Sequence, residues 1–283
     1  MVQRKVKHVE EERGSYGQQH SKEAYGGRPP EMTEDPFEIE YPWECFHYEV
    51  DRKEKIATVT MNNPGDGLPH WYPYPGLKLL ELWERDDDVK VVIFKSAGKN
   101  FCTGHSLGTY LDHYGMRSGS ADEAAKKKWT PPSPQSIMLS IRDIYHFHDR
   151  LGVSLKPTIA QVHGYCNNGG FHFVFEMDMI IASDDAHFGQ IGQVAGVSGG
   201  SGTPSWHHHI GTKTWREMVT CGRTFSARQA AQLGFINRVV PREKLDEEVW
   251  KEAQRIALIG IDGIVTGKYG AMREKYESAV MSY

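Results

Sequence analysis

Hydrophobic and polar residues alternate along two stretches near residue 50, Phe46–Val50 and Lys55–Met61. A period of two is typical of strands that bury one face, and the polar residues between the stretches predict the turn of a β-hairpin. Continuous hydrophobic runs at Val89–Phe94 and Thr158–Val162 are typical of strands buried on both faces, and Leu77–Trp83 has the spacing of a helix. Strands and helices alternate, which predicts an α/β fold.

The second half of the chain carries helix start and stop signals. Ser133 followed by Pro134 predicts a helix that runs to about Leu151. Ser226 occupies the capping position of a second helix, which Gly234 ends. The remaining predicted elements are a short strand over 236–240, a charged amphipathic helix over 241–259 and a last helical segment over 264–283.

Three segments lack such patterns. Residues 1–41 are polar and rich in charge of both signs, so we expect this arm to be ordered only along a surface, either of its own chain or of a neighbouring subunit. Residues 62–76 are rich in Pro, Gly and aromatic residues, which predicts a loop. Residues 109–134 form a long polar insertion, either a lid over a site or a plain surface insertion, and we favour the lid.

Composition narrows the class of protein. The chain has 283 residues, enough for one large domain with or without an appendage, and a formal charge of -4 that offers no basic surface for nucleic acid. It has no hydrophobic run long enough to span a membrane, and its first residues lack the hydrophobic segment of a secretory signal. The four cysteines form no CxxC pair. We therefore expect a soluble cytoplasmic protein with reduced thiols that binds neither nucleic acid nor a membrane.

The stretch from Thr158 to Gly202 contains the pattern that points most directly to chemistry. The strand is followed by a turn rich in glycine and asparagine, and then by the dense hydrophobic run of Phe171–Glu176, which predicts a buried helix. Gly169 and Gly170 leave the backbone N–H groups of this turn unhindered at the start of the helix. Unsatisfied amides and the helix dipole favour negative charge there, so the turn is suited to hold an oxyanion.

The order of FCTGHSLG, a helix, PTIAQVHGYCNNGGF, MDMIIASDDAHFGQ and GRTFSARQAAQLGFINRVVP resembles the crotonase (enoyl-CoA hydratase/isomerase) superfamily from about residue 44 onward. The resemblance implies an α/β crotonase-type fold, a spiral of ββα repeats with a helical C-terminal trimerisation region. It divides the chain into a polar N-terminal arm at 1–43, the spiral core at 44–225 and a helical region at 226–283, and it implies a homotrimer or homohexamer. The block HFGQIGQVAGVSGGSG is most similar to the branch of dihydroxynaphthoyl-CoA synthase and 2-ketocyclohexanecarboxyl-CoA hydrolase.

The resemblance also implies a shared catalytic device, in which two backbone N–H groups bind the oxygen of a developing enolate. By position these donors are the amides of His105, in FCTGHS, and Gly169, in NNGGF. The chain departs from the hydratases at both glutamate positions, which are His172 and Gly192 here. Ser198 stands where the naphthoyl synthase branch has an aspartate. Neither a pair of glutamates nor that aspartate is available for catalysis.

His172 is the candidate general base, because histidine titrates near neutral pH and here takes the place of a catalytic glutamate. Glu176 lies one helical turn further on, at a spacing where a carboxylate can orient the imidazole. The alternative is a core histidine whose hydrogen bonds are satisfied within the protein. Ser198 is a candidate to hydrogen-bond the substrate or a water, with turn capping as its alternative.

More histidines and aromatic residues surround the predicted site. The side chain of His105 could face the substrate, and His163 belongs to the same glycine-rich turn. The consecutive histidines at 207–209 point in different directions, so we expect no metal site. No cofactor is expected, and CoA would enter only as part of the substrate. The residues assigned to substrate binding are His70, Trp71, Tyr72, Tyr74 and Gly192.

Three functions remain open. A histidine base, a water and an oxyanion hole resemble the superfamily's carbon–carbon bond hydrolases, including the 6-oxocamphor hydrolase type, and imply hydrolytic C–C or ring cleavage of a β-dicarbonyl compound, free or as a CoA thioester. The second function is that of a hydratase or lyase acting on an enoyl-CoA, with histidine in place of glutamate. The third is a catalytically inactive scaffold. In the first two, the partner is a small-molecule substrate such as an acyl-CoA.

Overall fold

The computed structural model describes residues 45–69, 72–106, 134–194, 210–260 and 262–270. The chain enters through a hairpin of β1 (Phe46–Asp51) and β2 (Ile56–Met61), paired antiparallel with Phe46 opposite Met61. Four strands then join parallel to β2 in the order β1-β2-β4-β6-β8-β11. These strands are β4 (Val91–Ser96), β6 (Thr158–Val162), β8 (Met179–Ser183) and β11 (Arg238–Val240).

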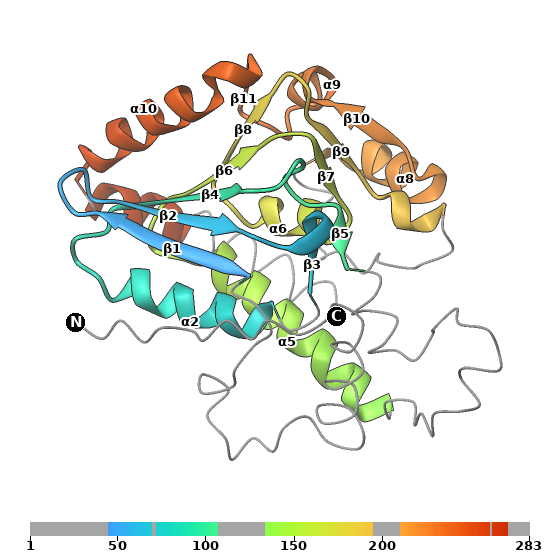
Figure 1. The fold of residues 1–283 in the computed structure, drawn as a ribbon, viewed down its shortest axis with the longest axis horizontal. Helices are drawn as coiled ribbons and strands as arrows, with labels where there is room; N and C mark the ends of the chain where they lie inside the picture. Colours follow the sequence, from blue (N-terminus) through green and yellow to red (C-terminus); the bar gives the residue numbers. More distant parts are fainter. Residues whose placement is uncertain (1–44, 70–71, 107–133, 195–209, 261, 271–283) are drawn as a thin grey trace.

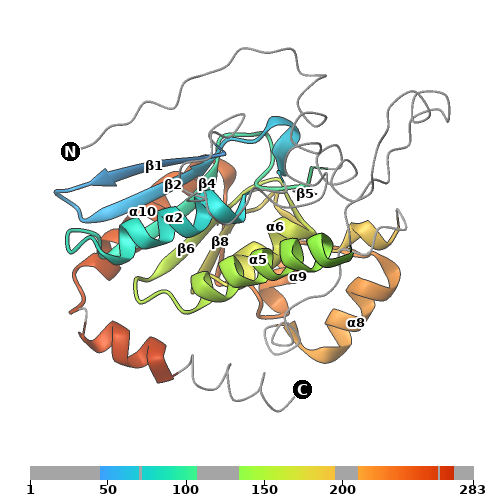
Figure 2. The ribbon, with the colours of Figure 1, turned by 90° about the horizontal axis from the view of Figure 1, so that it is seen from below.

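Helices cover both faces of this six-stranded sheet (Figures 1 and 2). On one face lies α10 (Leu245–Ala257), and on the other lie α2 (Pro73–Glu84), α5 (Pro134–Gly152) and the short buried helix α6 (Gly169–Phe175). Parallel strands need long crossover connections, and the helices that supply them bury both faces of the sheet. The continuous hydrophobic runs of β4 and β6 follow from this burial.

The two faces form two hydrophobic clusters. On the α10 side the alternate strand residues Ile56, Val91, Ile93, Ile159 and Ile181 pack with Leu245, Val249, Ala253 and Ile256. On the other side the core is larger and more aromatic, with Trp83, Phe94, Phe147 and Phe173 in edge-to-face and stacked contacts. This second core lies directly beneath α6, so the helix that carries the predicted site rests on densely packed rings.

Two smaller sheets extend from the main one. β7 (Tyr165–Asn167), β9 (His187–Gly189) and β10 (Thr224–Ser226) form a three-stranded sheet in the order β10-β9-β7. β3 (Gly67–Leu68) pairs parallel with β5 (Gly104–His105), and an isolated bridge joins Cys102 to Cys166. The segment of β5 therefore lies beside the segment of β7 that leads into α6. Two turns more than 60 residues apart in the sequence meet there.

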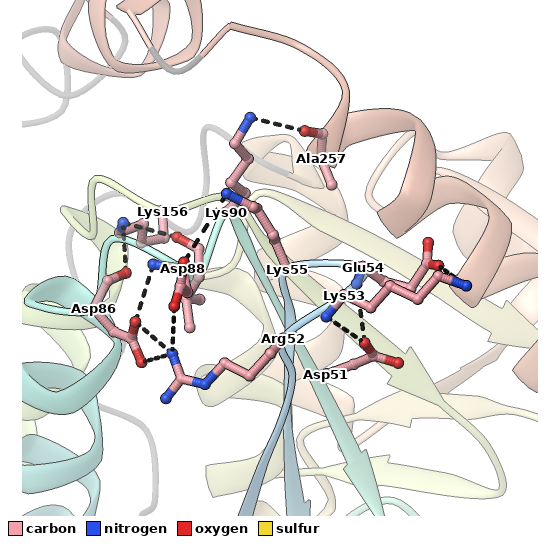
Figure 3. A network of polar contacts seen from close by, with 11 residues as sticks. Asp51, Arg52, Lys53, Glu54, Lys55, Asp86, Asp88, Lys90, Lys156 and Ala257 are labelled. Atoms are coloured by element: carbon pink, nitrogen blue, oxygen red, sulfur yellow. Dashed lines mark hydrogen bonds and ion pairs between the residues drawn. The ribbon is translucent and has the colours of Figure 1, made fainter.

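Polar contacts fix the β1–β2 turn against the far ends of β4 and β6 (Figure 3). Arg52 Nη1 donates to Asp86 Oδ1 at 2.7 Å, and Lys90 Nζ donates to the carbonyl oxygen of Ala257 at 3.2 Å. Lys156 is largely buried, and its Nζ donates to the Asp86 carbonyl oxygen at 3.3 Å. Exposed ion pairs contribute little stability, so this network chiefly sets the alignment of the turn.

Most of the predicted elements are confirmed. The hairpin, the buried strands, the helix from Pro134 and the helix capped by Ser226 all form, and the last of these, α9 (Ala227–Gln232), has a capping box between Ser226 and Gln229. Gly234 follows it with φ of 83°. A helical stretch at 262–270 agrees with the predicted last helix over its described part.

Several expectations need correction. Residues 62–76, predicted to be a loop, contain the 3-10 turn η1 (Pro64–Asp66), the strand β3 and the start of α2, because Pro73 opens that helix. The helix predicted from Pro241 begins as the 3-10 turn η3 (Arg242–Lys244) before α10. β7, β9, the 3-10 turn η2 (Ile191–Gln193) and α8 (Thr212–Cys221) were not predicted.

Other sequence-based expectations concern segments outside the described residues, the domain boundary, the cysteines and the membrane. The predicted arm at 1–43 lies outside the described residues, as does the predicted lid at 109–134 except for Pro134, which begins α5. β11 belongs to the main sheet although it follows the predicted boundary at 225, so the C-terminal region and the core share one sheet. All four cysteines are free thiols. Among the helices that the structure describes, none has the length and apolarity that a membrane crossing demands.

Candidate active site

The turn before α6 presents backbone amides at the start of a buried helix. Asn168, with φ of 48° and ψ of −118°, is the N-cap, and the first helical hydrogen bond runs from the His172 N–H to its carbonyl oxygen at 3.0 Å. The amides at 169–171 precede that bond, so they have no acceptor within the helix. The predicted strand and helix are confirmed, whereas the segment predicted as a turn between them contains β7 and the helix begins at Gly169.

The second predicted amide comes from β5. Because β3 and β5 are parallel and the Ser106 N–H donates to the Leu68 carbonyl oxygen at 2.8 Å, the N–H of His105 points to the opposite side, away from β3. On that side lies Gly169: the amide nitrogen of His105 is 3.6 Å from the position that a Cβ of residue 169 would take. The two amides predicted to hold an oxyanion therefore lie side by side.

Glycine at 169 and 170 is required by close packing. A Cβ on Gly169 would lie 2.6 Å from Cδ2 and 2.8 Å from Nε2 of the His105 ring. A Cβ on Gly170 would lie 2.4 Å from the Cβ of Cys102. The absence of side chains thus lets α6 approach the segment of Cys102 and His105 closely.

His172 lies on α6 with only 8% of its surface exposed, and its Nε2 is hydrogen-bonded to the side-chain amide of Gln190, which is fully buried. Gln190 reaches it from the end of β9. A second contact holds this segment in place, since Asn168 Oδ1 accepts a 2.9 Å hydrogen bond from the Gly192 N–H. As placed, Gln190 donates from its Nε2 and makes His172 Nε2 the acceptor; with the amide reversed, Gln190 Oε1 accepts from the ring Nε2–H and leaves Nδ1 as the basic nitrogen.

Electrostatics keep the His172 ring neutral. Burial lowers its pKa well below the ordinary value, and the neighbouring rings of His148 and His105 lower it further, while the hydrogen bond with Gln190 acts in the opposite direction. Burial also lowers the pKa of His105 to about 4. Both imidazoles are therefore uncharged near neutral pH, and His172 is in the form that can accept a proton.

The predicted aromatic residues divide into two sets. His70 and Trp71 lie outside the described residues, as do Ser198 and the histidines at 207–209. Tyr72 is completely buried, shares a 2.7 Å hydrogen bond with His148 Nε2 and packs edge-on against the His105 ring at a centroid distance of 5.6 Å. Tyr74 donates to Asp143 Oδ2 at 2.8 Å and so faces α5. Only Tyr72 is thereby placed beside the paired amides.

Three other predicted residues have defined places. Gly192 uses its amide on Asn168, so its backbone N–H holds the loop. Glu176 is buried at the C-cap of α6, and its role in orienting His172 stays a prediction, because the hydrogen bond identified on that ring is with Gln190. His163 donates from Nε2 to the Gly98 carbonyl oxygen at 3.0 Å, as expected of a core histidine.

Sequence reasoning missed three residues of the site: Asn168, His148 and Gln190. His148 falls on the hydrophobic stripe of α5 with Ile144, Phe147 and Leu151, and a polar residue in such a stripe is a signal that could have found it. Gln190 belongs to the FGQ block, which served only to recognise the superfamily. Within the described ranges, no group of three His, Cys, Asp or Glu side chains is arranged to hold a metal ion.

Comparison with known proteins identifies the family of the chain. The family model described as "Enoyl-CoA hydratase/isomerase" matches residues 51–281. The chain is 28% identical over 240 residues to "Putative enoyl-CoA hydratase EchA13" of Mycobacterium tuberculosis, covering 81% of this chain and 72% of that protein. It is 28% identical over 207 residues to "(E)-benzylidenesuccinyl-CoA hydratase" of Thauera aromatica, covering 71% and 73% respectively.

Solved structures give the same result for the fold. An enoyl-CoA hydratase/isomerase from Xanthobacter autotrophicus Py2 superposes with a TM-score of 0.73 at 26% identity, over 85% of this chain and 83% of that one. An enoyl-CoA hydratase of Mycobacterium smegmatis superposes with a TM-score of 0.70 at 22% identity, over 84% and 89%. The chain therefore belongs to the enoyl-CoA hydratase/isomerase family and has the crotonase fold that its sequence predicts.

Proposed function

We propose that this protein hydrolyses a carbon–carbon bond in a β-dicarbonyl CoA thioester and holds the leaving enolate on the amides of His105 and Gly169. The observation that carries the proposal is the buried, neutral His172, which stands beside the converging amides where the hydratases are expected to carry a glutamate. Gly192 supplies no carboxylate at the second position. One neutral base is sufficient to activate a water, whereas the paired-glutamate device is absent.

The proposed reaction adds one water to the substrate. His172 accepts a proton from the water, and the water oxygen attacks the carbonyl carbon remote from the thioester. The bond between that carbon and the α-carbon then breaks, and its electron pair forms the thioester enolate. The proton returns from His172 to the α-carbon, so the products are a carboxylic acid and a shortened acyl-CoA, and the base regains its neutral form.

The paired amides supply the stabilisation that this path needs. The thioester oxygen becomes negative only when the carbon–carbon bond breaks, and each preorganised donor typically contributes about 3 to 4 kcal/mol to such a transition state. Burial strengthens these interactions, because little water screens them. While the enolate exists, His172 carries the proton taken from the water, so the imidazolium beside the enolate is the acid that reprotonates the α-carbon.

A second candidate is hydration of an enoyl-CoA with His172 in place of glutamate. It is favoured by the names of relatives, which include "(E)-benzylidenesuccinyl-CoA hydratase" and "Putative enoyl-CoA hydratase EchA13". Both reactions form a thioester enolate on the same two amides. They differ in the carbon that water attacks, and therefore in the substrate.

The test compares two substrates with two variants. Acetoacetyl-CoA should yield acetate and acetyl-CoA, whereas crotonyl-CoA should yield no 3-hydroxybutyryl-CoA. His172→Ala should lower kcat on acetoacetyl-CoA by about 10² to 10⁴, the contribution of a general base, with little change in KM. His146→Ala is the matched control, because His146 is exposed on α5 and should leave turnover unchanged.

Each outcome decides between the readings. Hydration of crotonyl-CoA without cleavage of acetoacetyl-CoA would establish the second candidate. Unchanged turnover in His172→Ala would remove His172 from the mechanism. No turnover and no binding of either thioester would leave the inactive scaffold as the explanation.

A further inference from the structure

The side chain of His105 lies at the same place as the two amides. Its ring folds back over Gly169, with Cδ2 and Nε2 at 2.6 and 2.8 Å from the position of a Cβ on that glycine. The Nδ1 atom is inaccessible to solvent, while the residue as a whole is partly exposed. One residue thus brings both its backbone N–H and the Nε2 edge of its imidazole to the proposed oxyanion hole.

A second observation concerns how firmly this ring is held. Tyr72 packs against it edge-on, with 5.6 Å between ring centroids and 70° between ring planes. Tyr72 is in turn packed edge-on against Phe147 and hydrogen-bonded to His148 at 2.7 Å, and all three of these residues are buried. A rotation of the His105 ring towards α5 would have to displace a completely buried tyrosine.

We propose that the imidazole of His105 is a third hydrogen-bond donor to the enolate oxygen, beside the amides of His105 and Gly169, and that Tyr72 and His148 position it. The proposal rests on the proposed function in that both need a thioester enolate at this site. No covalent step is involved, because the imidazole keeps its proton and shares it in a hydrogen bond.

The charge state of the ring suits this role. A neutral imidazole carries one N–H, and a neutral histidine can polarise a carbonyl as a hydrogen-bond donor. Burial keeps His105 neutral at working pH by lowering its pKa to about 4. The ring therefore donates without bringing a full positive charge into a site that already holds the rings of His148 and His172.

The number of donors has a kinetic consequence. A carbonyl oxygen has two lone pairs, which the two amides already use, so a third donor gains a strong acceptor only when negative charge develops. An interaction made only in the transition state raises the rate rather than the affinity for the substrate. The His105 ring should therefore affect the maximal rate of enolate formation and not the binding of the thioester. A core histidine with a packing role only would not produce this separation.

The test uses acetyl-CoA, which can form the enolate but has no β-carbonyl to lose. The exchange of its α-hydrogens for deuterium in D₂O is followed by mass spectrometry, as a function of acetyl-CoA concentration. Four variants are compared with the wild type. They are His105→Ala, His105→Gln, Tyr72→Phe and the exposed control His146→Ala.

The expected result is a loss of about 100-fold in the saturating exchange rate of His105→Ala, with the half-saturating concentration within about threefold of the wild type. His105→Gln should recover at least about tenfold of this loss, because its side-chain NH₂ can occupy the place of Nε2. Tyr72→Phe should lower the saturating exchange rate about tenfold, since the aromatic ring of residue 72 stays while its hydrogen bond to His148 is removed. His146→Ala should exchange at the wild-type rate.

Three results would overturn the inference. The first is an exchange rate in His105→Ala equal to that of the wild type. The second is that His105→Ala and His105→Gln lose exchange rate and melting temperature equally, and the third is that the wild type exchanges no faster than buffer alone. The first two leave the proposed function standing, because acetoacetyl-CoA cleavage is measured separately. Exchange by the wild type that falls about 100-fold in His105→Ala, without acetoacetyl-CoA cleavage, would instead support the donor role of His105 while refuting the proposed function.

Discussion

Replacing Gly169 by alanine tests the oxyanion hole most selectively, because the neighbouring Gly170 provides a matched control. The methyl group of Gly169→Ala would lie 2.6 Å from Cδ2 and 2.8 Å from Nε2 of His105, so the ring must move. The methyl group of Gly170→Ala would instead lie 2.4 Å from the Cβ and 3.0 Å from the carbonyl oxygen of Cys102. The His105 side chain is partly exposed, so its ring can move aside in a direction away from Tyr72, but a backbone segment in a packed core cannot easily do so.

The expected magnitudes follow from this difference. Displacing one donor of an oxyanion hole typically costs about 3 to 4 kcal/mol, which is a factor of 10² to 10³ in kcat. Overpacking of a core typically costs about 1 to 3 kcal/mol of folding stability. Alanine itself favours a helix over glycine by up to about 1 kcal/mol, so the backbone opposes neither substitution. We expect Gly169→Ala to lose activity with a small change in stability, and Gly170→Ala to lose stability.

The assay combines α-hydrogen exchange of acetyl-CoA with urea unfolding of both variants. Gly169→Ala should lose at least about 100-fold in exchange rate, with its unfolding midpoint close to that of the wild type. Gly170→Ala should have a clearly lower midpoint. Wild-type exchange by a folded Gly169→Ala variant would refute the reasoning, because the His105 ring and the Gly169 amide would then lie away from the reacting oxygen.

Three further predictions concern the buried histidines. Because a base must be unprotonated and burial holds the pKa of His172 well below its ordinary value, kcat/KM should stay constant down to pH 6.5 and fall only at more acidic pH; an acid limb above pH 6.5 would contradict this. Gln190→Leu should lower kcat about tenfold and move that acid limb to still lower pH. The hydrogen bond with Gln190 raises the pKa of His172, so its removal lowers that pKa. Burial depresses the pKa of His105 in the folded state to about 4, so its contribution is fully present above pH 6.5 and is lost as pH falls towards 4. Compared with His105→Gln, the wild type should lose roughly 3 kcal/mol more stability between pH 7 and pH 4, measured by urea unfolding at each pH; equal slopes would mean that the ring is solvated.

Local features of the site could be read from the sequence. The strand Thr158–Val162, the glycine turn and the start of α6 are formed by consecutive residues, and their hydrophobicity and glycine content determine them. The pairing of His105 with Gly169 needed the resemblance to the crotonases, because nothing local brings residues so far apart together. In the structure the bridge between Cys102 and Cys166 brings the two turns together, and a Cβ on Gly169 would lie 3.6 Å from the amide nitrogen of His105.

Contacts between distant segments could not be read in this way. His172 meets Gln190 across 18 residues, and Tyr72 meets His148 across 76. The sequence did suggest a carboxylate partner for His172, because Glu176 follows it by one helical turn. Helical spacing alone cannot show that Gln190, directly after β9, forms a hydrogen bond with the same ring. The loop expected over 62–76 was wrong for a simpler reason: proline was taken as a breaker, whereas Pro73 opens α2.

The central claim is that water attacks a carbonyl carbon and a thioester enolate leaves on the amides of His105 and Gly169. The most direct measurement is turnover of acetoacetyl-CoA in ¹⁸O-labelled water, followed by mass spectrometry of both products. The account predicts ¹⁸O in the acetate and none in the acetyl-CoA. Release of free CoA with labelled acetoacetate, or intact acetoacetyl-CoA beside hydrated crotonyl-CoA, would contradict it.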